Sequence, residues 1–420
     1  MKKLFLSIFF LYTIVFMLTG CGDRTDSRTE SDSPVHAVFV LGSTANTPVL
    51  NIPAAADLIS RVCAQGGSTV SFLVADGQPY LFDEITAPEV DSSYSKTKQK
   101  QIIEARVAEM TSIVSEALAR EPHADYLGAI EMAGRILQSF DDDYEKELVI
   151  FGSCLSDVEP LDFSKMYLDN IDTEQVMDTL RATDNIAKLE GCSVTVYNCG
   201  DVAAPQKTLS PAERKVLQQI WESILEAGGP ETLIFATDLP TQLVYEGLPE
   251  VNTVPVVVES AALKEKEADA EPVRAPEADA VVFDETVIRF EPGAATLVDP
   301  QAAMEAIHEV RQFMEDHPEK KALLVGCTAR WGNEEDSLSL SFDRAAAIRS
   351  LFTDAGIRKD RLTILGTGWM SPFYKNDQAK DGGLDESIAP GNRSTVWIDA
   401  ESGLAELVLN SNYADKFLTE

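Results

Sequence analysis

A stretch rich in charge, alanine and proline divides the 420-residue chain into two parts. It runs from Ala261 to Ala280 and reads AALKEKEADAEPVRAPEADA. The stretch lacks apolar periodicity, and its charges and prolines favour a semi-extended linker. A chain of this length is also long for one hydrophobic core, because domains usually span about 100–200 residues. We therefore expect two α/β domains joined by a linker over residues 259–280.

The N-terminus has the pattern of a secretory signal. Lys2 and Lys3 precede an apolar run from Leu4 to Leu18, which is short for a membrane-spanning helix of about 20 residues. The sequence LTGC that ends at Cys21 resembles a lipobox. This resemblance implies removal of residues 1–20, acylation of Cys21 with diacylglycerol and palmitate, and an extracytoplasmic protein anchored by lipid in the cell membrane or outer membrane. Residues 21–34 are polar and predict a flexible tether.

Residues 35–258 alternate between short apolar runs and amphipathic segments. Helices are expected over Lys96 to Arg120 and Tyr126 to Phe140, and another begins at the capping sequence Ser210-Pro211. A hairpin edge is expected at Tyr80 to Phe82. The expected buried strands are Ala37–Leu41, Thr69–Val74, Leu148–Phe151, Val194–Asn198 and Thr232–Phe235. This alternation predicts a doubly wound, parallel α/β sheet.

The order of elements and two loops resemble a von Willebrand factor A-type (vWA) domain. DYLGA, from Asp125 to Ala129, opens a helix, and VIFGSCLSD ends a strand as the third metal loop of that family does. The resemblance implies a divalent-cation site with carboxylate and hydroxyl ligands. Gly42 stands where the first metal loop has its leading aspartate, so we expect no metal. The loop residues that remain candidates for binding are Ser43, Thr44, Asn46, Asp125, Ser153 and Asp157. Asp157 and Asp201 lie on loops after successive strands, and helix capping or turn formation is their alternative role.

The second half of the chain carries a series of motifs in a fixed order. They are VIRFEPGAATL from Val287, LVGCTARWG from Leu324, SLSFDRA from Ser339, DAGIRKDRL from Asp354 and GNRSTV from Gly391. Together they resemble the OmpA-like domain of outer-membrane proteins, Pal lipoproteins and flagellar stator proteins. The resemblance implies a βαβαββ sandwich over residues 281–400, with residues 401–420 as a tail. Val287 to Phe290 is the first strand expected.

In that family an aspartate and an arginine hold the ammonium and the carboxylate of peptidoglycan diaminopimelate. The resemblance places the arginine at Arg344, while Ala329 stands at the aspartate position and Thr328 precedes it. Asn392 and Arg393 match a further stretch that lines the site. Asp336 or Glu335 is a candidate substitute carboxylate, and an internal ion pair with Asp343 or Asp399 is the alternative role for the two arginines.

The remaining features limit the classes of function. A formal charge of −34 disfavours binding to nucleic acid. The five cysteines after Cys21 show no zinc spacing, and Cys192 and Cys199 are separated by a strand, so they are too far apart to bond each other. Common catalytic motifs are absent, so we expect neither an enzyme nor a cofactor. The expected partners are peptidoglycan, a lipid bilayer and an envelope protein. The expected function is wall tethering, with a protein-interaction scaffold that has lost wall and metal binding as the alternative.

Overall fold

The computed structural model describes residues 33–141, 143–236, 241, 243–259, 278–379, 382–410 and 418–419. The predicted signal peptide, Cys21, the tether up to residue 32 and most of the linker lie outside this range. Within the described residues, no helix combines the length and apolar character needed to cross a membrane.

The first sheet is built by strands that the sequence pattern located closely. Its order is β3-β2-β1-β4-β7-β8, and all neighbours are parallel except β2 and β3, which form an antiparallel hairpin. The expected parallel sheet with a hairpin edge is thereby confirmed. The strands are β1 (Val35–Leu41), β2 (Thr69–Val74), β3 (Tyr80–Thr86), β4 (Glu145–Phe151), β7 (Cys192–Tyr197) and β8 (Thr232–Ala236).

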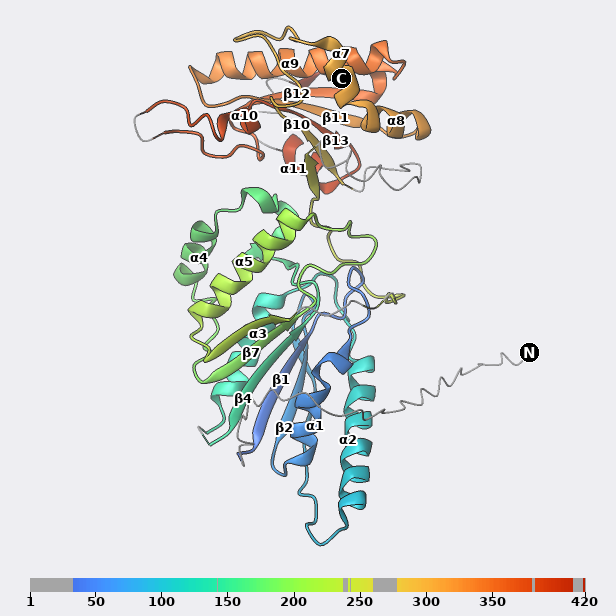
Figure 1. Ribbon diagram of the computed structural model, residues 1–420, viewed down its shortest axis with the longest axis vertical. Helices are drawn as coiled ribbons and strands as arrows, with labels where there is room; N and C mark the ends of the chain where they lie inside the picture. The colour runs from blue at the N-terminus through green and yellow to red at the C-terminus, as the bar shows by residue number, and fades with distance from the viewer. Residues whose placement is uncertain are drawn as a thin grey trace, which may run out of the picture. The chain divides into compact units, whose positions relative to one another are not determined.

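Helices cover both faces of this sheet (Figure 1). Alternate residues of β1 point to opposite faces, so Phe39 packs in one apolar cluster and Val38 in another. The Phe39 cluster includes α1 (Ala56–Ala64) and α2 (Lys96–Glu116), whereas the Val38 cluster includes α3 (Tyr126–Gln138), α4 (Thr173–Ala182) and α5 (Pro211–Ala227). The predicted capping box is present at the start of α5, where Ser210 and Glu213 exchange hydrogen bonds.

The second sheet has the order β14-β12-β11-β13-β10-β9. The strands are β9 (Val257–Glu259), β10 (Ala280–Phe283), β11 (Ala322–Cys327), β12 (Leu362–Gly368), β13 (Thr395–Asp399) and β14 (Leu418–Thr419). One face packs against α7 (Pro300–Ala306), α8 (His308–Asp316) and α9 (Glu334–Asp354), and the other against α11 (Gly403–Leu409). From β10 to β13 the sheet has the expected βαβαββ order. Three further elements extend this architecture. β9 lies at the expected end of the first domain, and α11 and β14 lie in the expected tail.

The first strand of this half differs from the sequence prediction. Val287 to Phe290 was expected to be a strand, but β10 takes that place beside β13. Val287 and Ile288 instead donate backbone hydrogen bonds to the Asp284 carbonyl, which makes a turn. Phe290 forms only an isolated bridge with Leu297. The prediction was wrong because four apolar residues next to the linker, three of them buried, already pair with the antiparallel strand β13.

Short elements complete the description. They are β5 (Asp157–Val158), β6 (Leu161–Asp162), α10 (Ala389–Asn392) and the 3-10 turns η1 (Ile52–Ala55), η2 (Phe163–Lys165), η3 (Leu168–Asn170) and η5 (Lys359–Arg361).

Candidate functional site

The loops after β1 and β4 meet at the carboxyl edge of the first sheet, where ligands of open α/β sheets usually bind. The Gly42 amide donates to the Phe151 carbonyl over 2.7 Å, which joins the two loops. Thr44 donates to the Asn46 carboxamide oxygen over 3.0 Å. The predicted loop residues Ser43, Thr44, Asn46 and Ser153 are all buried here. All four polar side chains that the sequence suggested for these loops thus lie inside the protein.

The Tyr126 side chain fills the space beside these loops. A Cβ atom at Gly42 would lie 1.8 Å from the Tyr126 hydroxyl oxygen, and one at Gly152 would lie 2.2 Å from it. The phenol is fully buried, and burial raises its pKa. An aspartate at position 42 therefore has no room. Across the described residues, no three His, Cys, Asp or Glu side chains are grouped so as to hold a metal ion.

The two predicted aspartates of this region bind backbone amides. Asp125 is the N-cap of α3 and accepts from the Gly128 amide over 2.8 Å. Burial raises the Asp125 pKa. The buried Asp157 carboxylate accepts from the amides of Ala124 (2.6 Å) and Asn252 (2.9 Å), and it lies 2.8 Å from His123 Nδ1. These contacts match the alternative role, in which the aspartates fix loop and helix ends.

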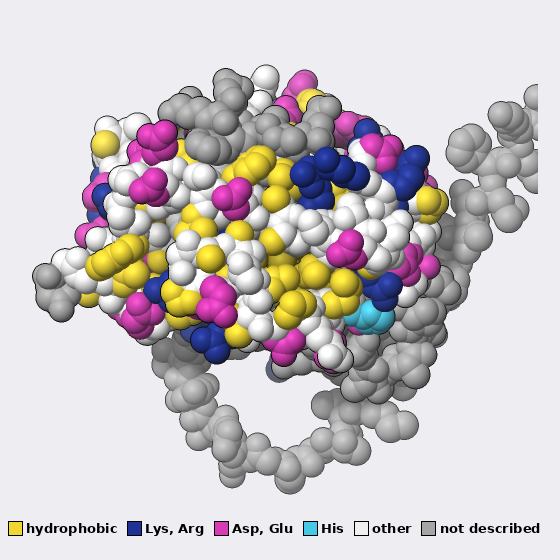
Figure 2. Space-filling view, turned by 90° about the horizontal axis from the view of Figure 1, so that it is seen from above, with side chains coloured by type: hydrophobic (Ala, Val, Ile, Leu, Met, Phe, Trp, Pro, Cys, Tyr) yellow, Lys and Arg dark blue, Asp and Glu magenta, His cyan; other side chains and the backbone are white. Residues whose placement is uncertain are grey.

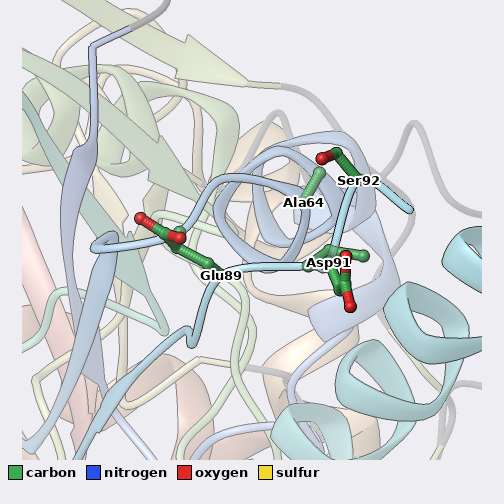
Figure 3. A pocket seen from close by; sticks show the side chains of 6 residues that line it. Ala64, Glu89, Asp91 and Ser92 are labelled. Carbon is green, nitrogen blue, oxygen red and sulfur yellow. The ribbon is translucent and has the colours of Figure 1, made fainter. Parts of the chain in front are cut away.

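A solvent-open hollow of about 530 Å³ lies near the opposite end of β2. Ala64, Gly66, Glu89, Val90, Asp91 and Ser92 line it. Figure 3 shows the Glu89 and Asp91 side chains pointing in different directions. Because its acidic groups do not converge on a shared point, the hollow offers no defined ligand geometry.

Arg344 is the candidate residue with the most informative surroundings. It lies on α9 and is only 7% exposed. Its Nε donates to the Ala294 carbonyl over 3.1 Å, and its guanidinium carbon lies 5.0 Å from the centre of the Phe290 ring. The loop that replaced the expected strand therefore holds this arginine. Burial lowers the Arg344 pKa, which Glu285 raises and Arg393 lowers to a smaller extent.

In the part of the chain that the structure describes, no carboxylate lies within ion-pair distance of Arg344. The internal ion pair weighed for this residue is absent there. Asp399 instead pairs with Lys320 over 3.1 Å. Buried arginines are normally paired with an anion, because an unpaired buried charge costs several kcal/mol. Arg344 is thus a buried cation that lacks an ion-pair partner among the described residues.

Arg393 differs from Arg344 because it is neutralised by two glutamates. Its Nη1 lies 2.7 Å from Glu285, and its Nη2 lies 3.0 Å from Glu386. The hydrogen bond with Glu386 is the largest of the effects that raise the Arg393 pKa. The internal pairing considered for Arg393 is thus real, although its partners are not the aspartates that the sequence suggested. Sequence spacing does not reveal Glu285, which lies 108 residues away.

Asp377 links the remaining candidates, and the sequence prediction missed it. Its carboxylate accepts from Asn392 Nδ2 over 2.9 Å and from the Arg330 amide over 3.1 Å, next to Ala329. Burial opposes ionisation of Asp377, but hydrogen bonds from Asn392, Tyr374 and Arg330 outweigh it and lower the pKa. The Asn392 side chain therefore stabilises the loop that carries Asp377, because it is hydrogen-bonded within the protein. Asp377 lies in the loop between β12 and α10 (Ala389–Asn392), and no sequence motif pointed to it.

The loop at the predicted aspartate position is compact. Ala329 is 5% exposed, and the buried Thr328 hydroxyl has no hydrogen-bond partner among the described residues. The proposed substitutes Glu335 and Asp336 are exposed in the first turn of α9, where Asp336 accepts from the Asn333 side chain over 2.6 Å.

Figure 2 views the molecule from the end at which α7 and α9 lie in Figure 1. Hydrophobic side chains form a band across this face, with Lys, Arg, Asp and Glu side chains around it. Side chains of both charges therefore lie on this face.

Comparison with known proteins identifies one family. Residues 289–382 match the model of the OmpA family, so an OmpA family domain occupies this part of the chain. No curated protein matches the chain.

Several solved structures resemble part of the chain. A putative MotB-like protein from Desulfovibrio vulgaris is 21% identical, with 28% of this chain and 73% of that chain covered and a TM-score of 0.23. The peptidoglycan-associated lipoprotein from Burkholderia pseudomallei is 22% identical, with 30% and 98% covered and a TM-score of 0.22. The periplasmic domain of Helicobacter pylori MotB is 13% identical, with 30% and 80% covered and a TM-score of 0.23.

Proposed function

We propose that this chain is a non-catalytic lipoprotein of the bacterial cell envelope that binds peptidoglycan through its OmpA family domain. The observation that carries this proposal is Arg344, a buried guanidinium without a carboxylate partner among the described residues. The family match over residues 289–382 supports the same assignment. The N-terminal α/β domain, which we propose to be vWA-like, serves as a docking or sensing module.

The chemistry follows from the guanidinium. Arg344 uses its Nε on the Ala294 carbonyl, so its terminal Nη groups are available for the carboxylate of a peptide stem. Hydrogen bonds to charged groups contribute about 1.5–3 kcal/mol each. Phe290 covers the guanidinium and limits its hydration, which strengthens the attraction for an anion.

Co-sedimentation with peptidoglycan sacculi tests the proposal. We expect the chain from residue 22 onward to pellet with sacculi that contain diaminopimelate. Arg344→Ala should weaken pelleting at least about tenfold, since a charge-assisted hydrogen bond is lost. Arg344→Lys should fall between the two, because lysine keeps the charge but lacks the planar fork.

The matched control is Arg358→Ala, which removes an exposed arginine that, within the described ranges, pairs with exposed Asp360. This variant should pellet like wild type. Circular dichroism must show that Arg344→Ala remains folded. If folded Arg344→Ala pellets as well as wild type, the arginine does not bind the wall and the proposal fails.

The lipid anchor is a separate part of the proposal, supported by the LTGC sequence that ends at Cys21. Mass spectrometry of the protein from membranes should find the chain beginning at an acylated Cys21. Cys21→Ser should release the protein from the membrane fraction. An uncleaved N-terminus in the wild-type protein would contradict lipid anchoring without affecting the wall-binding proposal.

A protein-interaction scaffold is the second candidate, and two observations favour it. Ala329 lacks the carboxylate that the family uses, and Tyr126 occupies the space beside Gly42. Ala329→Asp separates the candidates. If wild type stays in solution and Ala329→Asp pellets with sacculi, the domain has given up its wall ligand and the scaffold is supported. If both pellet, wall binding does not need the aspartate.

A further inference from the structure

Two thiols lie on adjacent loops at the carboxyl edge of the first sheet. Cys154 follows β4 and Cys199 follows β7, so 44 residues separate them in sequence. The Gly200 amide donates to the Ser153 carbonyl over 2.9 Å. Those two peptide groups also contain the Cys199 carbonyl and the Cys154 amide. One hydrogen bond therefore joins the two peptide units that flank the cysteine Cα atoms.

The side chains meet as well. The Cys199 thiol, by a hydrogen bond, and burial, to a smaller extent, raise the Cys154 pKa well above its ordinary value. Cys154 is 2% exposed, and its carbonyl accepts from the Trp221 indole over 2.8 Å, which fixes its backbone at a φ of 59°. A disulfide requires Cα atoms about 4.4–6.8 Å apart with converging side chains. The hydrogen bond between the two peptide units keeps the cysteine Cα atoms close, and the hydrogen bond between the thiols shows that the side chains converge.

The other described cysteines contact different atoms. Cys63 lies 3.4 Å from the Met110 sulfur, Cys192 contacts Gln138 over 3.8 Å, and Cys327 contacts Ser371 over 3.4 Å. Burial raises the pKa of Cys63 and of Cys192 to about 11. Among the described residues, Cys154 and Cys199 are thus the two thiols placed to react with each other.

We propose that Cys154 and Cys199 form a redox-sensitive disulfide that ties the loop after β4 to the loop after β7. The extracytoplasmic location proposed above would supply an oxidising environment, but the pairing itself depends only on these loops. The oxidant is a disulfide donor, either a small molecule or a protein.

The reaction proceeds by two thiol–disulfide exchanges. Cys199, the more exposed of the two, attacks one sulfur of the donor as its thiolate and releases the first donor thiolate. Cys154 then loses its proton and attacks the Cys199 sulfur of the mixed disulfide, which releases the second donor thiolate. The two protons of the cysteines pass to the two released thiolates, and the protein transfers two electrons to the donor.

Peptide mapping of the full-length chain after treatment with oxidised glutathione tests this proposal. Trypsin places Cys154 on one peptide and both Cys192 and Cys199 on another, because Lys165, Arg181 and Lys188 lie between them. We expect the two peptides to be joined in wild type and in Cys192→Ser. Cys154→Ser should instead carry glutathione on Cys199, whereas Cys199→Ser should leave the buried Cys154 unmodified.

A thermal measurement provides a second readout. Oxidation should raise the unfolding midpoint of wild type by roughly 5 °C or more, because the disulfide restricts the unfolded chain. Cys154→Ser with Cys199→Ser should melt as a folded protein with no response to oxidation. Absence of the joined peptides from oxidised, folded wild type would overturn the proposal, as would joined peptides in Cys199→Ser. Neither result bears on pelleting with sacculi.

Discussion

The carboxyl edge of the first sheet and the Arg344 region differ in what surrounds their buried polar side chains. At the sheet edge, the Tyr126 ring lies against Gly42 and Gly152, and Thr44 bonds within its own loop. At Arg344 the protein supplies one carbonyl and one aromatic ring to a guanidinium, but no carboxylate among the described residues. The first region is filled by its own side chains, whereas the second retains a charge that can bind an outside partner.

This difference shows two structural outcomes at positions where the sequence resemblances placed an aspartate. At the first sheet the position is Gly42, and the Tyr126 ring fills the space beside it. In the OmpA family domain, Ala329 replaces the expected aspartate, yet Arg344 is kept in a buried position. Burying a charge without a partner is costly for stability, which agrees with the anion-binding role proposed for Arg344.

Gly42→Ala should have the largest effect, because the added Cβ would lie 1.8 Å from the Tyr126 hydroxyl and 2.5 Å from the ring carbon that bears it. The ring cannot withdraw from a close-packed core, so we expect a loss of at least about 3 kcal/mol in the free energy of unfolding. Urea unfolding followed by circular dichroism measures this loss.

Gly403→Ala is the matched control, because a Cβ there meets no atom within 4 Å and the residue begins a helix. It should leave stability unchanged or slightly higher. Combining Gly42→Ala with Tyr126→Ala should cost less than the sum of the two single changes, since the clash and the ring are removed together. Strict additivity would mean that Tyr126 does not fill the space beside Gly42.

Glu213 contrasts with Arg344, because it is a buried charged-type side chain whose carboxyl group is hydrogen-bonded within the protein. Burial raises its pKa to about 7 from an ordinary value of 4.5, despite a hydrogen bond from the Ser210 amide. The folded state therefore binds the proton more tightly than the unfolded state does. Its contribution to stability is fully present below pH 4.5 and is lost as the pH rises to about 7.

The size of this effect is about 2–3 kcal/mol, from the change in pKa. Thermal unfolding of wild type and Glu213→Gln across this pH range isolates it, since other groups titrate equally in both proteins. The stability of Glu213→Gln should not decline in this way as the pH rises. Glu222→Gln, an exposed change on the same helix, should follow wild type. A wild-type curve parallel to that of Glu213→Gln would contradict the raised pKa.

Arg393→Ala tests whether pairing decides which arginine binds. Arg393 is neutralised by Glu285 and Glu386, so its removal should weaken pelleting with sacculi only about threefold to fivefold, or about 1 kcal/mol. Arg344→Ala should be clearly worse. If the order is reversed, the unpaired state of Arg344 is not the property that matters for wall binding.

The sequence located most of the fold because its strands are short apolar runs bounded by turn residues. β2 was predicted at its observed bounds, and the start of α5 followed from its capping box. The sequence could not show that Ala280 to Phe283, and not Val287 to Phe290, forms the first strand. Both are short runs rich in apolar residues, and only pairing with β13 distinguishes them.

The site was predicted less completely, because its partners are distant in sequence. Arg344 was found from a local motif, whereas its neighbour Glu285 and the ordering carboxylate Asp377 come from separate loops. The bulky residue that fills the space beside Gly42 was also missed. Tyr126 was recognised as the start of a helix, but the direction of its ring depends on the absence of side chains at Gly42 and Gly152.

The smallest effect on stability is expected for Trp331, whose fluorescence gives a direct spectroscopic test of the region around Arg344 and Ala329. It follows Ala329 by two residues and is 69% exposed, whereas Trp221 and Trp397 are buried. An exposed indole next to a binding loop changes its fluorescence when a ligand excludes water from it. Soluble fragments of peptidoglycan that carry diaminopimelate should therefore shift the emission to shorter wavelength, with little change in stability.

Trp331→Phe should remove this shift while keeping wild-type pelleting with sacculi, since phenylalanine preserves an aromatic surface. Arg344→Ala should remove the shift by removing the binding. A wild-type protein that pellets with sacculi but shows no shift would place the ligand away from Ala329, on the side of Glu285 and Phe290. A shift that survives in Arg344→Ala would mean that the fragments contact the loop at Ala329 without using Arg344. The difference between the Arg344 region and the carboxyl edge of the first sheet would then not explain binding.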